Sequence, residues 1–250
     1  MSKSGIIVIK IGTSTLTLDN KLDLQNLQRI VKEIALSKKK AIIVTSGAIV
    51  TGAQKLGLAS KPKTIPEKQA AAAIGQSVLM RQYEKAFEKF GITTAQVLLT
   101  RDALTDKERY RNVRNTLTTL LNEGVVPIVN ENDTVSTEEI KVGDNDTLSA
   151  LVSELISADI LVLLTDVDGF YIKDKKVDVI KKITKEIRFA AGHSLTEIGT
   201  GGMITKINAA QICMSSGISV FIANGRERGA INSIISGKKI GTKFCPKKYR

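Results

Sequence analysis

The sequence has 250 residues but no tryptophan, one histidine, four prolines and two cysteines. The cysteines, Cys213 and Cys245, cannot form the disulfide framework of a small secreted domain and match no metal-ligand spacing. No apolar run approaches the roughly 20 residues of a membrane-spanning helix, and residues 1–5 are too polar to begin a secretory signal. We therefore expect a cytoplasmic protein that does not enter the membrane.

Aromatic residues are also scarce, at 4%, although the net charge is +12. Basic residues cluster at 38–40, at 173–176 and along the tail from 238 to 250. None of these clusters interleaves aromatic residues at the spacing of a base-stacking surface. The pattern favours a solvated basic surface that helps to attract an anionic substrate, and it does not favour nucleic acid as a partner.

What the sequence does contain is a series of apolar, β-branched runs that end in glycine, hydroxyl or other polar residues. These runs are 6–11, 41–44, 96–99, 125–129, 160–164 and 218–222. Runs of this kind are typical of strands that are buried on both faces of a parallel sheet.

Segments with helical periodicity lie between these runs. Asp23 can cap a helix whose apolar face consists of Leu24, Leu27, Ile30, Val31 and Ile34. Further helices are expected at 67–90, 147–156 and 203–215, with a polar loop around 61–67. The alternation predicts an α/β fold with an open, mostly parallel central sheet sandwiched between helices. Because no linker-like composition or repeat interrupts it, we expect a single domain over residues 1–250.

The residues that follow the runs are the candidate site, because ligands of open α/β sheets bind beyond the carboxyl ends of the strands. The first run carries Lys10 near its end and leads into Gly12, and the second leads into Ser46 and Gly47. Glycines at such turns let backbone N–H groups approach an anion, and a following helix adds a favourable dipole. Each turn by itself is explained equally well as a tight turn.

Two stretches rich in asparagine and aspartate follow the fourth run, at 130–133 and 141–147. Asparagine and aspartate also favour turns and helix caps. We expect Asp146 or Thr147 to cap the next helix while the other side chains of the two stretches, Asp133 and Asn145 among them, face a ligand.

Two more strand ends carry polar groups. Thr165 and Asp166 follow the fifth run, and a glycine-rich turn at 199–202 enters a helix that presents Lys206. The turn has phosphate-binding chemistry but does not match the P-loop consensus, and the sequence has no dinucleotide fingerprint. A flexible hairpin would explain the glycines but not the lysine.

In this order, and over nearly the whole chain, these motifs resemble the amino acid kinase family. The resemblance is most specific in Asn-Glu-Asn-Asp at 130–133, Lys-Val-Gly-Asp-Asn-Asp at 141–146 and Thr-Gly-Gly-Met-x-Thr-Lys at 200–206, which are similar to the members that act on glutamate. It implies the amino acid kinase fold, with the glutamate site mainly in the N-terminal part and the nucleotide site mainly in the C-terminal part. Relatives often carry an additional C-terminal RNA-binding-like domain, which we do not expect in a chain that ends at Arg250.

The resemblance also implies a role for individual residues. Lys10 and Lys206 would contact the phosphates, and Asp146 would fix the positions of both lysines. Ser46, Asp133 and Asn145 would hold glutamate. The residues implied in nucleotide binding are Lys10, Gly12, Thr165, Asp166, Thr200, Gly201, Gly202, Met203, Ile204, Thr205 and Lys206. No residue is expected to bind a metal directly, and the single histidine, His193, is expected to be a surface or loop residue.

The implied reaction is the phosphorylation of the γ-carboxylate of L-glutamate by ATP with Mg²⁺, which gives glutamyl 5-phosphate in the first step of proline biosynthesis. The resemblance further implies feedback inhibition by proline, a homo-oligomer and hand-over of the acyl phosphate to glutamyl phosphate reductase.

Three alternatives remain open at this point. The acceptor could be another small acid or a nucleoside monophosphate, although the latter would require arginines near 133–146, where only Lys141 occurs. An RNA-binding protein would use the net charge, and retention on RNA with a steep salt dependence and no ATP turnover would favour it. A non-catalytic amino-acid sensor on a kinase scaffold is the third, and Lys10, Asp146 and Lys206 argue against it.

Overall fold

The computed structural model describes residues 5–58, 60–135, 145–192 and 202–246. Its centre is an eight-stranded sheet with the order β10-β12-β11-β7-β1-β4-β6-β5. The predicted runs form β1 (Ile6–Ile11), β4 (Lys40–Val44), β5 (Thr94–Leu99), β6 (Val126–Glu131), β7 (Ile160–Thr165) and β11 (Ser219–Asn224), joined by β10 (Val179–Ile180) and β12 (Thr242–Phe244). Every neighbouring pair is parallel except β11 and β12. The predicted mostly parallel α/β sheet is confirmed.

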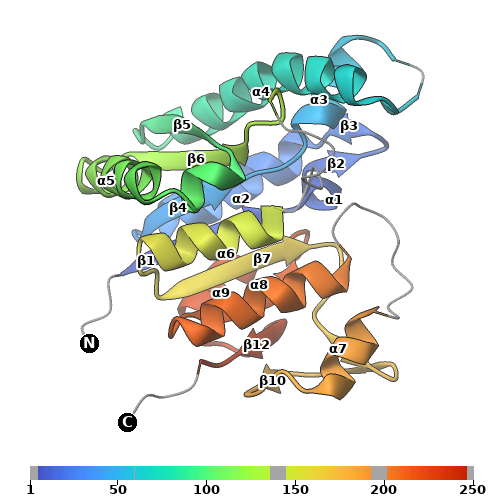
Figure 1. Cartoon of the computed structure of the whole chain (residues 1–250), viewed down its shortest axis with the longest axis vertical. Helices are drawn as coiled ribbons and strands as arrows, with labels where there is room; N and C mark the ends of the chain where they lie inside the picture. The colour runs from blue at the N-terminus through green and yellow to red at the C-terminus, as the bar shows by residue number, and fades with distance from the viewer. Residues whose placement is uncertain (1–4, 59, 136–144, 193–201, 247–250) are drawn as a thin grey trace.

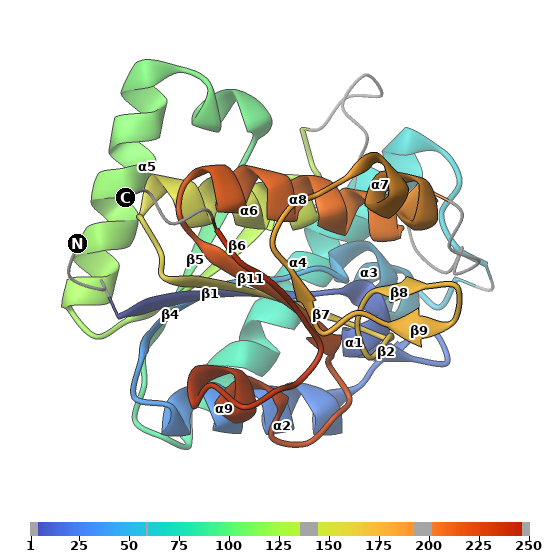
Figure 2. The same ribbon diagram turned by 90° about the horizontal axis from the view of Figure 1, so that it is seen from below.

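Helices cover both faces of this sheet. One face packs against α5 (Lys107–Asn122), α6 (Asn145–Leu155), α7 (Lys185–Gly192) and α8 (Met203–Ser215), and the other against α2 (Leu24–Leu36), α4 (Ile65–Glu88) and α9 (Ala230–Ile235). Figure 2 shows α6 and α8 on one side of the sheet and α2 and α9 on the other. The central strands therefore meet no water on either face, which explains their continuous apolar runs.

The side chains of β1 show how Lys10 enters the site. Ile7, Ile9 and Ile11 pack into the core with α2, whereas Val8 packs into the core with α6 and α8. Because side chains alternate along a strand, Lys10 lies on the same face as Val8. It is only 8% exposed and comes one residue before the end of the strand.

The small elements gather at the carboxyl ends of the central strands. They are α1 (Thr13–Leu16), the hairpin of β2 (Thr17–Leu18) and β3 (Lys21–Leu22), and α3 (Ala48–Lys55). Figure 1 shows all four at one end of the sheet. A 3-10 helix, η1 (Arg101–Leu104), follows β5, and a hairpin of β8 (Tyr171–Ile172) and β9 (Lys175–Lys176) follows β7.

Side chains cap the starts of α2 and α4. Asp23 caps α2 as predicted, because its carboxylate accepts a hydrogen bond from the backbone N–H of Asn26 at 3.0 Å. Thr64 and Glu67 form a reciprocal capping box, and α4 begins at Ile65. The last residues of the polar loop predicted around 61–67 therefore form the first turn of α4. Pro66 fits there because the first turn leaves its N–H groups without helical partners.

The predicted cap of α6 is wrong. The helix begins at Asn145, so Asp146 and Thr147 already lie within it and neither is its N-cap residue. Asp146 lies instead in the first turn, with its side chain buried.

Two glycines hold α3 against α4. A Cβ atom on Gly75 of α4 would lie 1.8 Å from the carbonyl oxygen of Ala48, and one on Gly52 of α3 would lie 1.7 Å from that of Ala71. The two backbones therefore approach more closely than any side chain would allow. This contact sets the position of α3, which borders the site described below.

No helix in the described ranges is long and apolar enough to cross a membrane.

Candidate active site

Three charged side chains from distant parts of the chain meet in the interior. Lys10 Nζ lies 2.7 Å from Asp146 Oδ1, and Lys206 Nζ lies 3.2 Å from Asp146 Oδ2. Each is less than a tenth exposed. The structure thus brings together the three residues for which a catalytic role was predicted.

The topology explains this meeting. Lys10 lies near the carboxyl end of β1, while Asp146 and Lys206 lie in the first turns of α6 and α8. Both helices cover the face of the sheet to which Lys10 points. The Thr205 hydroxyl lies 2.7 Å from Asp146 Oδ2 and 2.8 Å from the Gly202 carbonyl oxygen.

The electrostatics of this group keep Asp146 ionised. Burial by itself raises the pKa of Asp146, but the charges of Lys10 and Lys206 outweigh burial, and the pKa falls to about 2. Burial is also the largest effect on Lys206 and lowers its pKa, whereas the charge of Asp146 opposes that shift. Two positive charges beside one negative charge leave a net positive site, which suits a polyanion such as a nucleotide phosphate.

The residues predicted to bind nucleotide lie around the two lysines. Thr165 and the exposed Asp166 follow β7, and the Thr165 hydroxyl bonds the Asp166 carboxylate at 3.0 Å. Asp166 is close enough for its charge to raise the pKa of Lys206. The backbone N–H of Gly12 is held by the Leu164 carbonyl at 3.1 Å.

The other predicted nucleotide residues that the structure describes, from Gly202 to Lys206, belong to the start of α8. Gly202 is its N-cap residue, Met203 is buried, and Ile204 is 37% exposed. Thr200 and Gly201 lie outside the described residues, as does His193.

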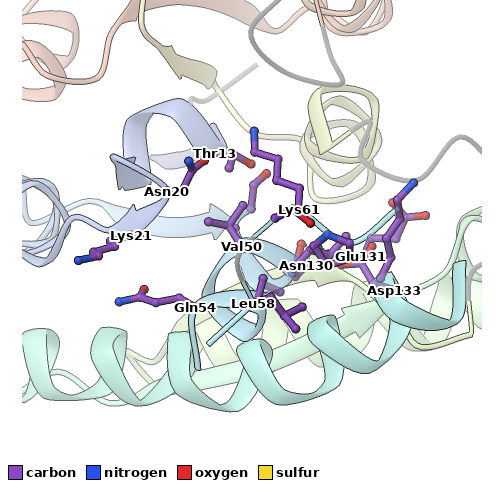
Figure 3. Close-up of a pocket in the computed structure, with 18 of the residues that line it drawn as sticks. Thr13, Asn20, Lys21, Val50, Gln54, Leu58, Lys61, Asn130, Glu131 and Asp133 are labelled. Atoms are coloured by element: carbon purple, nitrogen blue, oxygen red, sulfur yellow. Dashed lines mark hydrogen bonds between the residues drawn. The ribbon is translucent and has the colours of Figure 1, made fainter. Parts of the chain in front are cut away.

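A cavity of about 580 Å³ adjoins this group at the carboxyl ends of β4 and β6. All three predicted glutamate-binding residues, Ser46, Asp133 and Asn145, line it. Figure 3 shows Asn130, Glu131 and Asp133 together on one side, Asn20 and Lys21 on the other, and Val50 and Lys61 between them. Asn145 lines the cavity and Asp146, the next residue, holds the lysines, so consecutive residues join the cavity to the phosphate site.

A second cavity, of about 780 Å³, lies at the opposite end of the sheet, where the strands begin. Gly5, Asp159 and Ser219, which precede or begin β1, β7 and β11, line it. Ligands of open α/β sheets bind beyond the carboxyl ends of the strands. Of the two cavities, the one lined by Asp133 lies at those ends.

Asn145 is held by several hydrogen bonds. Its Nδ2 donates to acceptors on three residues: the Thr45 carbonyl at 2.6 Å, the Asn130 Oδ1 at 2.9 Å and the Ser46 Oγ at 3.0 Å. The two hydrogens of this NH₂ group are therefore fully used inside the protein. The Asn145 side chain therefore has only its acceptor, Oδ1, left for a ligand.

Donors for a ligand carboxylate come from the adjacent turn. The first helical hydrogen bond of α3 runs from the Thr51 N–H to the Gly47 carbonyl at 2.9 Å. The N–H groups of Ala48, Ile49 and Val50 precede it and have no partner within the helix. All three residues line the cavity, and Gly47 reaches this turn with a φ of 95°, which favours glycine.

Asp133 has an unusual environment. Burial raises its pKa to about 7, and the negative charge of Glu131 adds to the shift. Both carboxyl groups line the cavity. A cationic group that entered between them would reverse this shift, because an opposite charge favours the ionised carboxylate.

Sequence reasoning missed several residues of the cavity. No role was predicted for Glu131, which lies in the Asn-Glu-Asn-Asp motif, or for Lys61 and Lys68. Gln76 does not line the cavity, but it accepts a hydrogen bond from the lining residue Asn130 and lies in the middle of an alanine-rich helix. One signal could have identified it, namely an amide on the apolar face of a helix, where an unpaired polar group would be destabilising.

The comparisons with known proteins agree with this geometry. Residues 5–224 match the amino acid kinase family. Glutamate 5-kinase of Thermoanaerobacter sp. (strain X514) is 52% identical over 253 residues, which cover 97% of this chain and 68% of the relative. Glutamate 5-kinase of Clostridium acetobutylicum is 48% identical over 258 residues, which cover 99% of this chain and 97% of the relative.

A solved structure shares the fold. Isopentenyl phosphate kinase from T. acidophilum, in a product complex, superimposes with a TM-score of 0.66 at 22% sequence identity, over 96% of this chain and 99% of that chain. At this identity the likeness extends to the fold alone. Three findings lead to one conclusion, namely the match over residues 5–224, the identity to the two relatives and the shared fold. This chain belongs to the amino acid kinase family.

Proposed function

We propose that the protein is a glutamate 5-kinase, which transfers the terminal phosphoryl group of ATP to the γ-carboxylate of L-glutamate. The observation that carries the proposal is the continuity of the site through Asn145 and Asp146. One residue lines a cavity that suits an amino acid, and the next holds two lysines that suit phosphates. The relatives that share about half of the sequence are glutamate 5-kinases.

The reaction needs charge neutralisation more than proton transfer. A carboxylate is already ionised at pH 7, so the nucleophile needs no general base. Its oxygen forms the new bond to the γ-phosphorus while the bond to the β–γ bridging oxygen breaks, and ADP leaves. Two unit charges 4 Å apart repel by about 4 kcal/mol at an effective dielectric constant near 20. Lys10 and Lys206 can offset this repulsion and the charge that develops in the transition state.

Asp146 serves as an organiser of these lysines. With a pKa of about 2 it stays ionised through the neutral range, so it is not the group that gains or loses a proton there. Its two oxygens each face one lysine, at 2.7 and 3.2 Å. Because the ammonium groups are fixed before ATP arrives, little reorganisation is needed during the reaction.

Magnesium fits this arrangement as a companion of ATP. Among the described residues no group of three or more histidine, cysteine, aspartate or glutamate side chains forms a metal cage. Mg²⁺ keeps much of its water and is often held by nucleotide phosphates with one or two carboxylates. Asp166 is an exposed carboxylate of the nucleotide region whose charge acts on Lys206, and it could serve in this way. The ion would supply additional neutralisation of the phosphates.

The cavity supplies complementary groups for a free amino acid. Asp133 and Glu131 are acceptors for an α-ammonium group, and the Ser46 hydroxyl and the first N–H groups of α3 are donors for a carboxylate. The Ser46 Oγ accepts a bond from Asn145, which leaves its own hydrogen for a ligand. Feedback inhibition by proline, a homo-oligomer and hand-over of glutamyl 5-phosphate to a reductase remain predictions.

ADP release with alternative acceptors tests the proposal. The purified protein is assayed with ATP, Mg²⁺ and, in turn, glutamate, aspartate, N-acetylglutamate and a nucleoside monophosphate. N-Acetylglutamate has no ammonium group and would leave Asp133 unpaired, which costs roughly 1–3 kcal/mol. We expect kcat/KM for glutamate to exceed that for N-acetylglutamate by at least about tenfold. Efficient use of N-acetylglutamate or of the nucleotide would contradict the proposal.

A further inference from the structure

Three buried amide side chains form a row between helix α4 and the cavity. Asn145 Nδ2 donates to Asn130 Oδ1 at 2.9 Å, and Asn130 Nδ2 donates to Gln76 Oε1 at 2.9 Å. All three side chains are less than a tenth exposed. They come from α6, β6 and α4, so the row crosses three elements.

Backbone groups of fixed polarity determine which way each amide faces. The Thr45 carbonyl can only accept, and it lies 2.6 Å from Asn145, so the group that faces it must be the NH₂. The Glu131 N–H can only donate, and it lies 2.9 Å from Asn130, so the group that faces it must be the carbonyl oxygen. Rotating either amide by half a turn would place two acceptors or two donors against each other. Gln76 must then present its Oε1 to Asn130.

One acceptor is left over at the cavity end of the row. Within the described residues, Asn145 Oδ1 is buried and has no hydrogen-bond partner. Buried polar atoms without partners are rare because they are destabilising. Asn145 lines the cavity, so a donor on a bound ligand can supply the missing partner.

We infer that Gln76 is a positioning residue for the amino-acid substrate, which acts through Asn130 to keep Asn145 Oδ1 available as an acceptor for the α-ammonium group. The inference rests on the proposed function. Gln76 itself is absent from the cavity lining. Its Oε1 is the acceptor for the Asn130 NH₂ group. Without it, that buried NH₂ group would lack its acceptor, so the Asn130 amide would be held at its oxygen alone and the Asn145 amide would have a less firmly fixed neighbour.

Two substitutions of Gln76 separate this role from a purely structural one. Gln76→Met keeps the length and flexibility of the side chain but removes the acceptor. Gln76→Glu keeps an acceptor oxygen in the same place, whether the carboxyl is ionised or not, and introduces a buried acid. Leu79→Ala is the control, because Leu79 is fully buried on the same helix but has no polar group that could take part in the amide row.

Steady-state kinetics with a competitive inhibitor provide the readout. Glutarate has both carboxylates of glutamate but no ammonium group. We expect Gln76→Met to raise the KM for glutamate about tenfold, which corresponds to one buried hydrogen bond, while the KM for ATP, kcat and the KI of glutarate change less than about twofold. Gln76→Glu should lower the Tm through its buried acid yet keep the KM for glutamate within about threefold. Leu79→Ala should lower the Tm without changing the KM.

The outcomes distinguish the inference from the proposed function. If the parent protein does not phosphorylate glutamate, the proposed function is wrong. If it does, and Gln76→Met leaves the KM for glutamate unchanged or changes the KI of glutarate equally, Gln76 has no role in recognising the ammonium group and the inference is wrong. A KM that rises in parallel with the loss of Tm in all three variants would also overturn it.

Discussion

Asp146 combines two properties that seldom occur together in one side chain, since it is almost fully buried and yet strongly acidic. Its pKa of about 2 depends on the two lysines, because burial by itself would raise it. Removal of this negative charge leaves two buried ammonium groups facing each other. The residue therefore affects both the geometry and the charge of the phosphate site.

Substitution Asp146→Asn tests the organising role. We expect kcat to fall by at least about two orders of magnitude, and the KM values to change less, because the lysines lose their fixed positions. The pH dependence of kcat between 6 and 8 should stay as it is in the parent, since a group with a pKa of about 2 does not titrate there. A pH profile of the parent that disappears in the variant would identify Asp146 as a proton acceptor instead.

The ammonium group of Lys206 would directly offset the charge that develops in the transition state. Lys206→Ala should lower kcat by about two to three orders of magnitude, as the loss of one such donor does. A far-ultraviolet circular dichroism spectrum and the Tm show whether the variant is folded. Turnover near that of the parent in a folded variant would show that Lys206 does not contact the transferred group.

Asp133 gives glutamate binding a pH dependence. Its pKa of about 7 means that the carboxyl is mostly protonated at pH 6 and mostly ionised at pH 8. Only the ionised form pairs with an ammonium group, so kcat/KM for glutamate should rise about tenfold from pH 6 to 8. At saturating glutamate, kcat should be nearly constant over this range. Asp133→Asn, which cannot titrate, should bind weakly at every pH and lose the dependence.

The same shift affects folding stability with a definite sign. The pKa of Asp133 is raised from 3.8 to about 7 in the folded protein, so between these values the folded state binds more protons than the unfolded state. The contribution of Asp133 to the free energy of unfolding therefore falls as the pH rises from about 4 to 7 and is constant above that range. Glutamate, by pairing with the carboxylate, should raise the Tm more at pH 8 than at pH 6.

At the scale of elements, the contact of α3 with α4 positions the glutamate site. Gly75 and Gly52 allow the two backbones to touch, and the turn that precedes α3 carries Ser46. The Ala48 carbonyl, which a side chain on Gly75 would strike, belongs to the first residue of α3. A change in α4 is therefore transmitted to the N–H groups that face the cavity.

Gly75→Ala tests this transmission. The new Cβ would lie 1.8 Å from the Ala48 oxygen and 2.4 Å from the Gly52 nitrogen, and both are backbone atoms that can yield only if α3 moves. We expect the free energy of unfolding to fall by about 1–3 kcal/mol or more and the KM for glutamate to rise more than that for ATP. Ser77→Ala, two residues along at an exposed position of α4, is the matched control. Its effect on stability should stay within about 0.5 kcal/mol.

The elements differ in how well the sequence predicts them. The six apolar runs became strands, and 203–215 became α8 with both ends as predicted. Helix α5 was not predicted, because only two of its residues, Leu117 and Leu121, are buried and most of the others are polar. The antiparallel strand β12 was missed for a similar reason, since its three residues carry too little pattern.

At the scale of the whole molecule, 37 lysines and arginines against 25 aspartates and glutamates create a positive field. Such a field raises the rate of encounter with anionic substrates and falls with ionic strength. The site itself is also net positive, with two lysines around one aspartate. The charge therefore has a use that does not involve nucleic acid.

A measurement of RNA binding tests whether the positive charge serves to attract anionic substrates rather than nucleic acid. At physiological salt, a fluorescence polarisation titration with a labelled single-stranded RNA should show no sub-micromolar complex, whereas weak binding that disappears with added salt is expected of any basic surface. Over the same salt range, kcat/KM for ATP should fall as the field is screened, while kcat stays nearly constant. A tight, sequence-selective complex would add a nucleic-acid role to the protein.

The sequence by itself determined the local structure and the chemistry that is available. Burial on both faces requires continuous apolar strands, so their positions could be predicted, and the motifs at their ends resemble one family. Even the capping of α2 by Asp23 is a local property and was predicted correctly.

Only the tertiary structure decided which polar groups meet. Lys10, Asp146 and Lys206 are far apart in the chain, and they converge because β1 is central in the sheet and α6 and α8 cover the face to which Lys10 points. The direction of the Asn145 amide depends on Thr45 and Asn130, and the place of Gln76 depends on how α4 packs. Burial makes each of these contacts decisive, because a buried polar group must find its partner within the protein or in its ligand.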